Sequence, residues 1–162
     1  MSEQALIRFF KIMNPLMLGM WRLGLGRMIN IWPAVIGRMM VITHTGRVTG
    51  LKRQTPVNYT IVDGELYGMA GQGVKADWYR NLMSCPQAAV WLPDGRWEAC
   101  AEDVTARPDA LRLWRAALKD SGFAAPVFGG INPYTIADEA LAEKVKDYRL
   151  IHFQRVSKVE AR

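Results

Sequence analysis

The first 62 residues of the chain contain almost no acidic side chains. Between Glu3 and Asp63 there is no aspartate or glutamate, whereas eight lysines and arginines lie in the same stretch. From Asp63 onward 13 basic residues face 14 acidic ones, so the net charge of +6 arises in the first 62 residues. A basic stretch without acidic neighbours indicates an anionic partner: a nucleic acid, an anionic membrane surface or an acidic cofactor.

Cysteine and histidine are also scarce. The two cysteines, Cys85 and Cys100, lack CxxC spacing, and His44 and His152 are the only histidines that could join them. A disulfide framework is therefore excluded, and a closed zinc site, which needs four clustered ligands, is not expected. We predict two free thiols in a reducing cytoplasm and no bound metal.

Long apolar runs are missing. In the first 62 residues the longest uncharged runs, residues 12–21 and 28–37, are about ten residues each and contain Pro15 or Pro33. A membrane-spanning helix needs about twenty apolar residues, and the N-terminal stretch does not have the pattern of a secretory signal. We therefore expect a cytoplasmic protein without a spanning helix.

Residues 4–21 place apolar side chains at helical spacing, with Arg8, Lys11 and Asn14 off that stripe. Pro15 lies inside the pattern and is expected to kink or split the helix. The helix either packs on the body of the protein or serves as a basic amphipathic helix on a membrane or over a cofactor pocket. Leu23 to Gly26 ends it and begins an irregular connector that carries Trp32-Pro33.

Beyond this connector the apolar period changes from about 3.6 to two, and 162 residues suit one domain with one core. Asp63-Gly64 between two alternating runs predicts a type I′ hairpin. The pattern predicts strands over 39–43, 57–62, 65–70, 88–92, 96–104 and 148–156, helices over 76–84, 108–119 and 136–144, and a loop over 121–134. Hairpins joined by short helices and closed by a late strand indicate an antiparallel barrel with helices outside, in the α+β class.

The segment from Thr43 to Pro56 has the composition of an anion-binding loop between two strands. Gly46 and Gly50 allow close backbone approach, Arg47 and Arg53 can hold an anion in bidentate fashion, and threonine hydroxyls are interspersed. By itself the pattern is equally typical of a solvated turn.

A second segment, Gly71 to Leu82, leaves a strand through Gly-Gln-Gly and enters a helix, whose first amides favour anions. Trp78 and Asn81 are three residues apart and share one helix face. An indole beside a side-chain amide can form the wall of a pocket for a planar heteroaromatic group, although Trp78 can equally be an anchor in the core.

At these two segments together the chain resembles the deazaflavin (F420)-dependent nitroreductase and quinone-reductase family of split β-barrel oxidoreductases. The residues that carry the resemblance are Asn14-Pro15, Arg22 to Gly26, Val41 to Gly50, Arg53 to Pro56, Trp78 to Leu82 and Cys85-Pro86.

The resemblance implies a split antiparallel β-barrel with peripheral helices. Residues 1–37 would form the N-terminal amphipathic helix and connector, and residues 38–162 the cofactor-binding barrel, within one structural domain. The cofactor would be F420, whose deazaflavin ring carries a hydride and whose tail bears a phosphate and several glutamates. The enzyme would be an F420H2-dependent oxidoreductase that delivers a hydride to a hydrophobic, electron-poor acceptor such as a quinone, an enone or a nitroaromatic.

The resemblance also implies site residues. The phosphate and tail would lie at Arg47, Val48, Thr49, Arg53, Gln54, Thr55 and Pro56. The ring would be lined by Ala70, Gly71 and Gln72, with Trp78, Arg80 and Asn81 completing the pocket. Some relatives close a late tyrosine-bearing loop over the substrate, which makes Tyr134 the candidate catalytic residue.

Two positions depart from the family pattern. Val48 stands where many relatives have lysine, and Gln72 where some have lysine next to the ring. Fewer cations would weaken F420 binding, so a flavin- or haem-binding split-barrel protein, using FMN, FAD or haem, is the alternative.

Partners of other classes are less well supported. No nucleic-acid-binding motif accompanies the basic charge, so no nucleic acid is expected, and a basic nucleic-acid or membrane-surface binder is the third hypothesis. Residues 4–21 are compatible with peripheral contact at the inner membrane face, and a homodimer is compatible with the fold.

Overall fold

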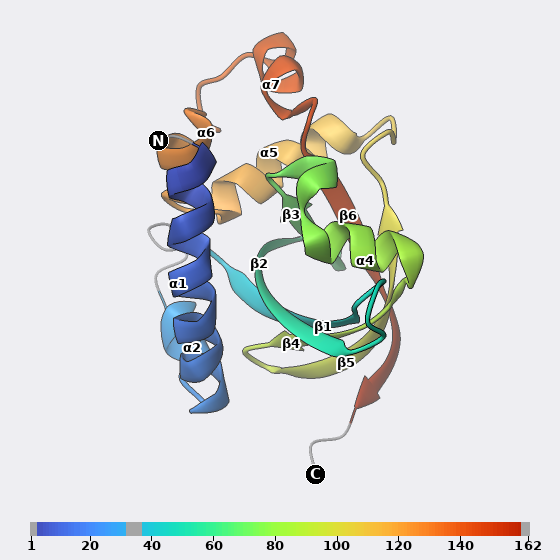
Figure 1. Cartoon of the computed structure of the whole chain (residues 1–162). Coiled ribbons are helices and arrows are strands. Elements are labelled where there is room, and N and C mark those ends of the chain that lie inside the picture. Colours follow the sequence, from blue (N-terminus) through green and yellow to red (C-terminus); the bar gives the residue numbers. More distant parts are fainter. Residues whose placement is uncertain (1–2, 32–36, 160–162) are drawn as a thin grey trace.

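The computed structural model describes residues 3–31 and 37–159. Within them, six antiparallel strands close into a barrel in the order β1-β2-β3-β6-β5-β4 (Figure 1). The strands are β1 (Met39–Thr45), β2 (Lys52–Val62), β3 (Glu65–Ala70), β4 (Gln87–Leu92), β5 (Gly95–Asp103) and β6 (Arg149–Val159). The helices are α1 (Glu3–Arg22), α2 (Gly26–Ile29), the 3-10 helix η1 (Gly73–Lys75), α4 (Asp77–Ser84), α5 (Ala110–Asp120), α6 (Ala124–Gly129) and α7 (Asp138–Val145). The predicted α+β class, an antiparallel barrel with helices outside, is confirmed.

The predicted hairpin between β2 and β3 is present. Asp63 and Gly64 have φ values of 54° and 81°, and the strands pair from Val62 opposite Glu65. Positive φ at both central residues is what a type I′ turn requires, and its twist matches that of the flanking strands.

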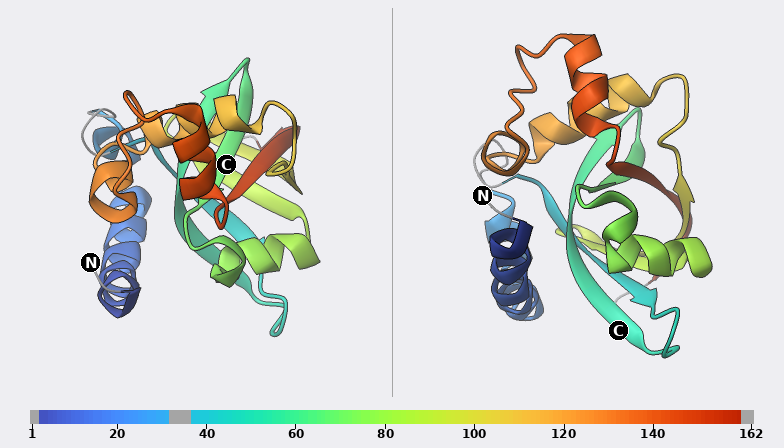
Figure 2. Two further views of the ribbon diagram at one scale, coloured as in Figure 1. Left: turned by 90° about the horizontal axis from the view of Figure 1, so that it is seen from above. Right: turned by 45° about the horizontal axis from the view of Figure 1, so that its top comes forward.

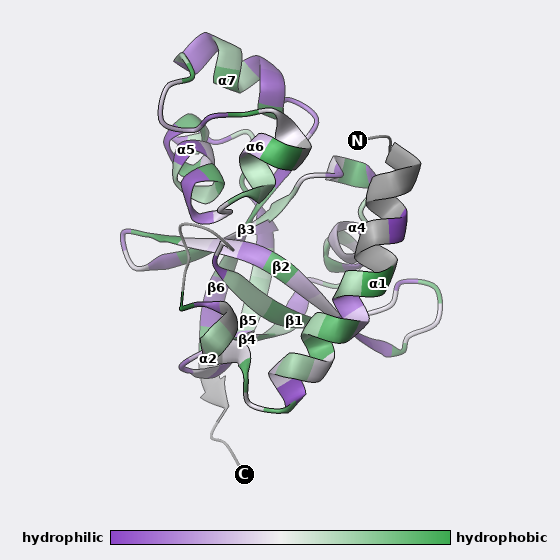
Figure 3. Cartoon of the chain, turned by 90° about the vertical axis from the view of Figure 1, so that its left-hand side faces the viewer, coloured by the Kyte–Doolittle hydropathy of each residue, from purple (hydrophilic) through white to green (hydrophobic). Residues whose placement is uncertain are grey.

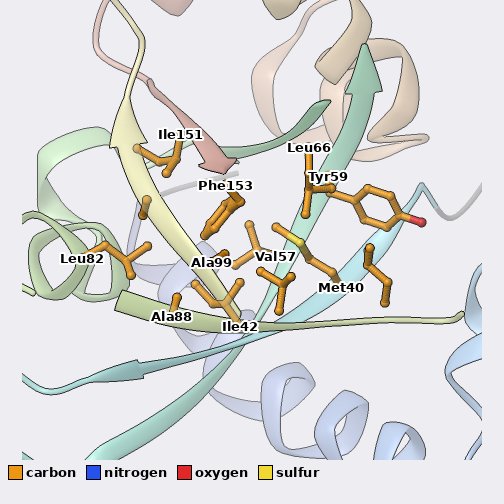
Figure 4. Packing of buried hydrophobic residues seen from close by; sticks show 13 residues of the cluster. Met40, Ile42, Val57, Tyr59, Leu66, Leu82, Ala88, Ala99, Ile151 and Phe153 are labelled. Atoms are coloured by element: carbon orange, nitrogen blue, oxygen red, sulfur yellow. The ribbon is translucent and has the colours of Figure 1, made fainter. Parts of the chain in front are cut away.

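The barrel interior is filled by side chains that alternate inward from every strand (Figure 4). Phe153 of β6 is 1% exposed and crosses this interior. A Cβ at Gly68 of β3 would lie 2.8 Å from its ring, so this glycine makes room for the phenylalanine. Leu82 of α4 is fully buried in the same cluster, and α4 contacts β1 and β5, so α4 is packed on the barrel core.

Helix α1 lies along the outside of the barrel (Figures 1 and 2). Trp21 anchors it: this side chain is 2% exposed, packs on Val41 and meets the ring of Trp91 edge-on, with 6.1 Å between ring centroids. The Arg96 guanidinium lies 3.8 Å from the centroid of the Trp91 ring. The packed-helix interpretation of residues 4–21 therefore holds at the C-terminal end of α1.

Of the kink or split predicted at Pro15, the split is wrong, because α1 runs unbroken from Glu3 to Arg22; the kink stays a prediction. Pro15 is exposed, so the carbonyl that loses its intrahelical donor there can be hydrated. Of the described residues, no helix combines the length and the apolar character needed to cross a membrane.

Two short helices lie in segments predicted to be irregular. α2 falls in the expected connector, whose Trp32-Pro33 lies outside the described residues. α6 falls in the expected loop over 121–134; it ends at Gly130 in the left-handed conformation with φ 61°, and Ala125 is buried against α5 and its neighbours. Helices this short are stabilised by such packing and not by propensity, which is why the sequence pattern did not reveal them.

Candidate functional site

The anion-binding segment is shorter than the loop predicted from Thr43 to Pro56. β1 continues to Thr45 and β2 begins at Lys52, with Thr45 opposite Lys52 and Val41 opposite Pro56. The connection is therefore the turn over residues 46–51, and Arg53 to Pro56 belong to a strand. Residues 52–56, Lys-Arg-Gln-Thr-Pro, do not alternate between apolar and polar side chains. This part of β2 is therefore a strand because it pairs with β1, and not because of its side-chain pattern.

Both glycines of the turn have a structural role. Gly50 has a φ of 68° and donates its N–H to the Gly46 carbonyl over 2.8 Å. A Cβ at Gly46 would lie 3.0 Å from both the Arg53 Nε and the Thr49 Oγ1. The first glycine thus lets an arginine and a threonine close around the turn, as an anion-binding cradle requires.

Four polar side chains form a directed hydrogen-bond chain beneath the turn. The Asn81 Oδ1 accepts from the Arg47 N–H over 3.1 Å and from its Nη1 over 2.9 Å. Because an arginine can only donate, the amide nitrogen of Asn81 faces the other way and donates to the Nδ1 of His44 over 3.2 Å. The proton of the neutral imidazole is therefore on Nε2, which donates to the Thr55 Oγ1 over 3.0 Å.

His44 is held in its neutral form. The side chain is 1% exposed, and burial lowers its pKa from 6.5 to about 4, with further lowering by the positive charges of Arg53 and Lys52 against a smaller opposing effect of Asp77. A neutral imidazole that donates to Thr55 leaves the hydroxyl proton of that threonine available to another acceptor.

A small cavity of about 180 Å³ opens above this chain. Arg47 there also pairs with the Asp77 carboxylate, with 3.0 Å between Nη2 and Oδ1. The cavity wall thus carries the guanidinium groups of Arg47 and Arg53 and the hydroxyl of Thr49 against the single carboxylate of Asp77. This excess of donors and positive charge favours an anion. The cavity is lined by Gly46, Arg47, Val48, Thr49, Arg53, Asp77 and Asn81, and we call it the anion cavity.

A larger cavity of about 220 Å³ lies next to it, and most of the residues that line it are apolar. β2 and α4 contribute to both cavities: Arg53 and Thr55 come from the same strand, and Asn81 and Trp78 from the same helix. The lining residues are Asn14, Thr55, Pro56, Val57, Asn58, Met69, Ala70, Gly71, Gln72, Ala76, Trp78, Leu118, Ala124, Ala125, Gly129 and Tyr148. We call it the ring cavity, after the residues predicted to line a ring.

Most of the predicted site residues gather around these two cavities. The anion cavity contains Arg47, Val48, Thr49, Arg53 and Asn81, and the ring cavity contains Thr55, Pro56, Ala70, Gly71, Gln72 and Trp78. Trp78 also packs on the barrel core, so it is both anchor and wall.

Three predicted residues line neither cavity. Gln54 accepts a hydrogen bond from the Arg22 Nη2 of α1 over 2.8 Å, and Arg80 is exposed on α4. Tyr134 is 70% exposed, with the Lys119 Nζ 5.4 Å from its ring centroid. Their assigned roles stay predictions.

The sequence argument missed His44, Asp77 and Tyr148. His44 was considered only as a metal ligand, although its inward position in an alternating strand could have marked it as buried. Tyr148 reaches the ring cavity because β6 pairs with β3, a long-range contact that no local pattern reveals. Of the described residues, no group of three or more His, Cys, Asp or Glu side chains could hold a metal ion.

Comparisons with known proteins give the family and the fold. The model of the family described as F420H(2)-dependent quinone reductase matches residues 23–123, which contain the anion cavity and most of the ring cavity. A search of curated proteins gives no match.

Solved structures give the fold. The conserved hypothetical protein Rv2991 from Mycobacterium tuberculosis is 19% identical, with 82% of this chain and 78% of that one covered and a TM-score of 0.51. The F420-H2 dependent reductase FDR-A is 21% identical, with coverages of 71% and 93% and a TM-score of 0.50. The haem storage protein HutZ from Vibrio cholerae is 13% identical, with coverages of 81% and 89% and a TM-score of 0.50. At these identities the likeness establishes the split-barrel fold alone.

Proposed function

This chain belongs to the F420H(2)-dependent quinone reductase family, and from that premise we propose that it delivers a hydride from F420H2 to a hydrophobic, electron-poor acceptor such as a quinone, an enone or a nitroaromatic. Membership makes it a deazaflavin-dependent oxidoreductase with F420 as its cofactor, as the sequence predicted. The acceptor class and the hydride transfer are the proposed part.

The observation that carries the proposal is the adjacency of two cavities of opposite chemistry. One is lined by Arg47, Thr49 and Arg53, and the other mainly by apolar residues with Trp78 in its wall. F420 has the same division, because a phosphate and glutamates form its tail and a flat deazaflavin its head. Arginine forks suit phosphate and carboxylate oxygens, and an indole suits a flat aromatic ring.

The cradle around Gly46 supports the fit on the tail side. A Cβ at this position would crowd the Arg53 Nε and the Thr49 Oγ1. The glycine therefore lets these two donors stay close to the turn. Arg47 and Arg53 would hold the phosphate, with Thr49 adding a hydroxyl. The Asp77 carboxylate competes with the phosphate for Arg47. Because the Asp77 side chain is 79% exposed, it can turn into solvent with a small loss of free energy.

The ring cavity would receive the deazaflavin, which supplies a hydride when it is reduced. The apolar lining excludes water and favours a hydrophobic acceptor over a charged one. Thr55, already accepting a hydrogen bond from His44, would donate its own proton to a polar edge of the ring or the acceptor. The protein thus binds, orients and desolvates, and the redox chemistry belongs to the cofactor.

Haem is poorly supported as the alternative. Both ring nitrogens of His44 are hydrogen-bonded, to Asn81 and to Thr55. The Nε2 of His152 lies 2.6 Å from the Glu65 carboxylate. As arranged, His44 offers no nitrogen to an iron, and His152 lines neither cavity. FMN or FAD would place a phosphate in the same anion cavity, and the alternative donors in the test of function separate them from F420.

Contact with a membrane surface is part of the proposal for a lipophilic acceptor. Helix α1 exposes Ile12 at 69% and Leu16 at 55%, and Arg8, one turn before Ile12, is exposed as well. Figure 3 shows this helix on the outside of the molecule, with both hydrophobic and hydrophilic residues along it. Apolar and basic side chains together favour an anionic bilayer surface. Co-sedimentation with anionic vesicles should fall when Ile12 and Leu16 are both changed to Ser, and unchanged co-sedimentation would argue against this contact.

The test of function is F420H2 oxidation with a panel of quinone, enone and nitroaromatic acceptors, with FMNH2 and NADPH as alternative donors. Arg47→Gln should lower kcat/KM by about ten- to a hundredfold through loss of charged hydrogen bonds to the tail. The matched control is Arg96→Gln, which removes an arginine that lies over Trp91 away from both cavities. Turnover with a flavin or NADPH but not with F420H2 would contradict the proposal.

A further inference from the structure

We propose that the Tyr148 hydroxyl binds and polarises the acceptor oxygen and gives it the proton it takes on reduction. This inference rests on the proposed function. It assigns the role of proton donor to a tyrosine in the cavity wall, immediately before the last strand, and not to Tyr134 in the loop before α7.

The sheet topology brings Tyr148 to the ring side of the cavity. Ala70, the last residue of β3, pairs with Arg149, the first residue of β6. Tyr148 therefore lies beside the turn that begins at Gly71, and a Cβ on Gly73 would come within 3.8 Å of its Cα. Tyr148 and the residues predicted to line the deazaflavin ring share one cavity.

Packing holds the tyrosine ring in place. Its edge meets Trp114 of α5, with ring centroids 6.1 Å apart and an interplanar angle of 64°, and it packs on the buried cluster under α5 and α7. The hydroxyl lies beside Gly129 of α6, where a Cβ would be 3.3 Å from the oxygen. Gly129 lines the cavity as well, so the hydroxyl lies at its wall.

This hydroxyl is not used by the fold. Among the described residues none is hydrogen-bonded to it, whereas the Tyr79 hydroxyl donates to the Asp103 carboxylate over 2.7 Å. Of the other polar side chains in the cavity wall, Asn58 donates to the Arg38 carbonyl and Thr55 accepts from His44. Asn14 and Gln72 line the same cavity, and Tyr148 differs from them in being held by aromatic packing. A polar group left unpaired in a mostly apolar wall indicates a place for a ligand atom.

The hydroxyl also keeps its proton. Burial raises the pKa of Tyr148 above its usual value of 10, so it is a donor throughout the physiological pH range. Tyr134 differs, since it is 70% exposed and lines neither cavity.

The step balances for a quinone. One carbonyl oxygen of the quinone receives the hydride, hence two electrons, that F420H2 gives up, and negative charge develops on the other oxygen. The Tyr148 O–H bond breaks as a new O–H bond forms on that oxygen, giving the hydroquinone. The other hydrogen that F420H2 loses leaves as a proton to solvent, and a solvent proton restores the Tyr148 phenol. A donor aimed at developing charge is among the larger contributions to catalysis.

The test compares Tyr148→Phe with Tyr67→Phe. The second variant deletes the hydroxyl of a buried tyrosine that lines neither cavity. Tyr148→Phe should lower kcat for quinone reduction by about ten- to a hundredfold, reduce the solvent isotope effect, and leave the F420 affinity from fluorescence titration unchanged. Tyr67→Phe should change none of these. Quinone binding to protein loaded with oxidised F420, where no turnover can occur, should weaken in Tyr148→Phe only.

The outcomes separate the two proposals. Suppose that the wild type oxidises F420H2 with a quinone and that Tyr148→Phe has the same kcat, solvent isotope effect and quinone affinity. This result would overturn the role of Tyr148 and leave the proposed function standing. A wild-type protein that does not oxidise F420H2 would overturn both. If Tyr148→Phe does not fold, Gly129→Ala places a methyl group 3.3 Å from the hydroxyl; it should raise the KM for quinone without changing F420 affinity, and an unchanged KM would count against the inference.

Discussion

Acid should destabilise this protein by protonating His44 in the unfolded chain, and the substitution His44→Gln should remove this part of the acid sensitivity. The folded protein keeps the imidazole neutral, with a pKa of about 4 against 6.5 when exposed. Between these values the unfolded chain binds a proton that the folded protein does not. The contribution of His44 is therefore fully present above pH 6.5 and is lost as the pH falls toward 4.

The magnitude follows from the pKa shift. One proton of difference costs about 1.4 kcal/mol per pH unit. With pKa values of about 4 and 6.5, the free energy of unfolding should fall by about 2 kcal/mol between pH 7.5 and pH 5.

His44→Gln provides the comparison. Glutamine has no proton to gain, yet its oxygen can accept from Asn81 and its amide can donate to Thr55, as the neutral imidazole does. Urea unfolding at a series of pH values should show that the free energy of unfolding of the wild type falls between about pH 7.5 and pH 5. In His44→Gln this fall should be smaller by about 2 kcal/mol. His152→Gln, which retains His44, should retain the drop. The same pH dependence in wild type and His44→Gln would refute the neutral, hydrogen-bonded imidazole.

Three further predictions concern the anion cavity and the barrel, the last of them with a matched control on α1. Asp77→Asn releases Arg47 from its ion pair and should tighten F420 binding by about two- to fivefold in a fluorescence titration. Val48→Lys adds a cation to a position that is 84% exposed and should tighten binding by a similar factor of about two to five at low salt, with the gain screened at high salt. Gly68→Ala puts a Cβ 2.8 Å from the phenylalanine in the barrel and should lower the free energy of unfolding by about 1–3 kcal/mol. Gly19→Ala, in open space on α1, should raise it by up to about 1 kcal/mol.

Each of these has a clear contrary result. Weaker F420 binding after the Asp77 change would mean that this carboxylate helps to hold the cofactor. A gain from the new lysine that persists at high salt would argue against simple charge attraction. Equal unfolding midpoints for the two glycine variants would contradict the tight packing inside the barrel.

The elements that the sequence predicted well are those whose signals are local. Asp63-Gly64 is a turn because aspartate tolerates and glycine favours positive φ, and the alternating residues around it define two strands. The segment 52–56 escaped prediction because polar residues and a proline there pair with β1, and the partner strand decides their conformation.

The candidate site divides in the same way. Gly46 and Gly50 predicted a turn suited to an anion. In the structure Gly46 leaves room for Arg53 and Thr49, and Gly50 has a positive φ. The neutrality of His44 depends on burial and on Asn81, which is 37 residues away in the chain. Tyr148 depends on the pairing of the last strand with β3. Contacts of this kind arise only when the barrel closes, so composition and spacing could not reveal them.

The most direct test of the account is an equilibrium titration of the purified protein with oxidised F420, followed by its fluorescence. The account predicts saturable binding that weakens with salt, weakens by about ten- to a hundredfold in Arg47→Gln, and is stronger than binding of FMN. No fluorescence change on adding F420, or an affinity that is the same in Arg47→Gln as in wild type, would contradict the assignment of the two cavities.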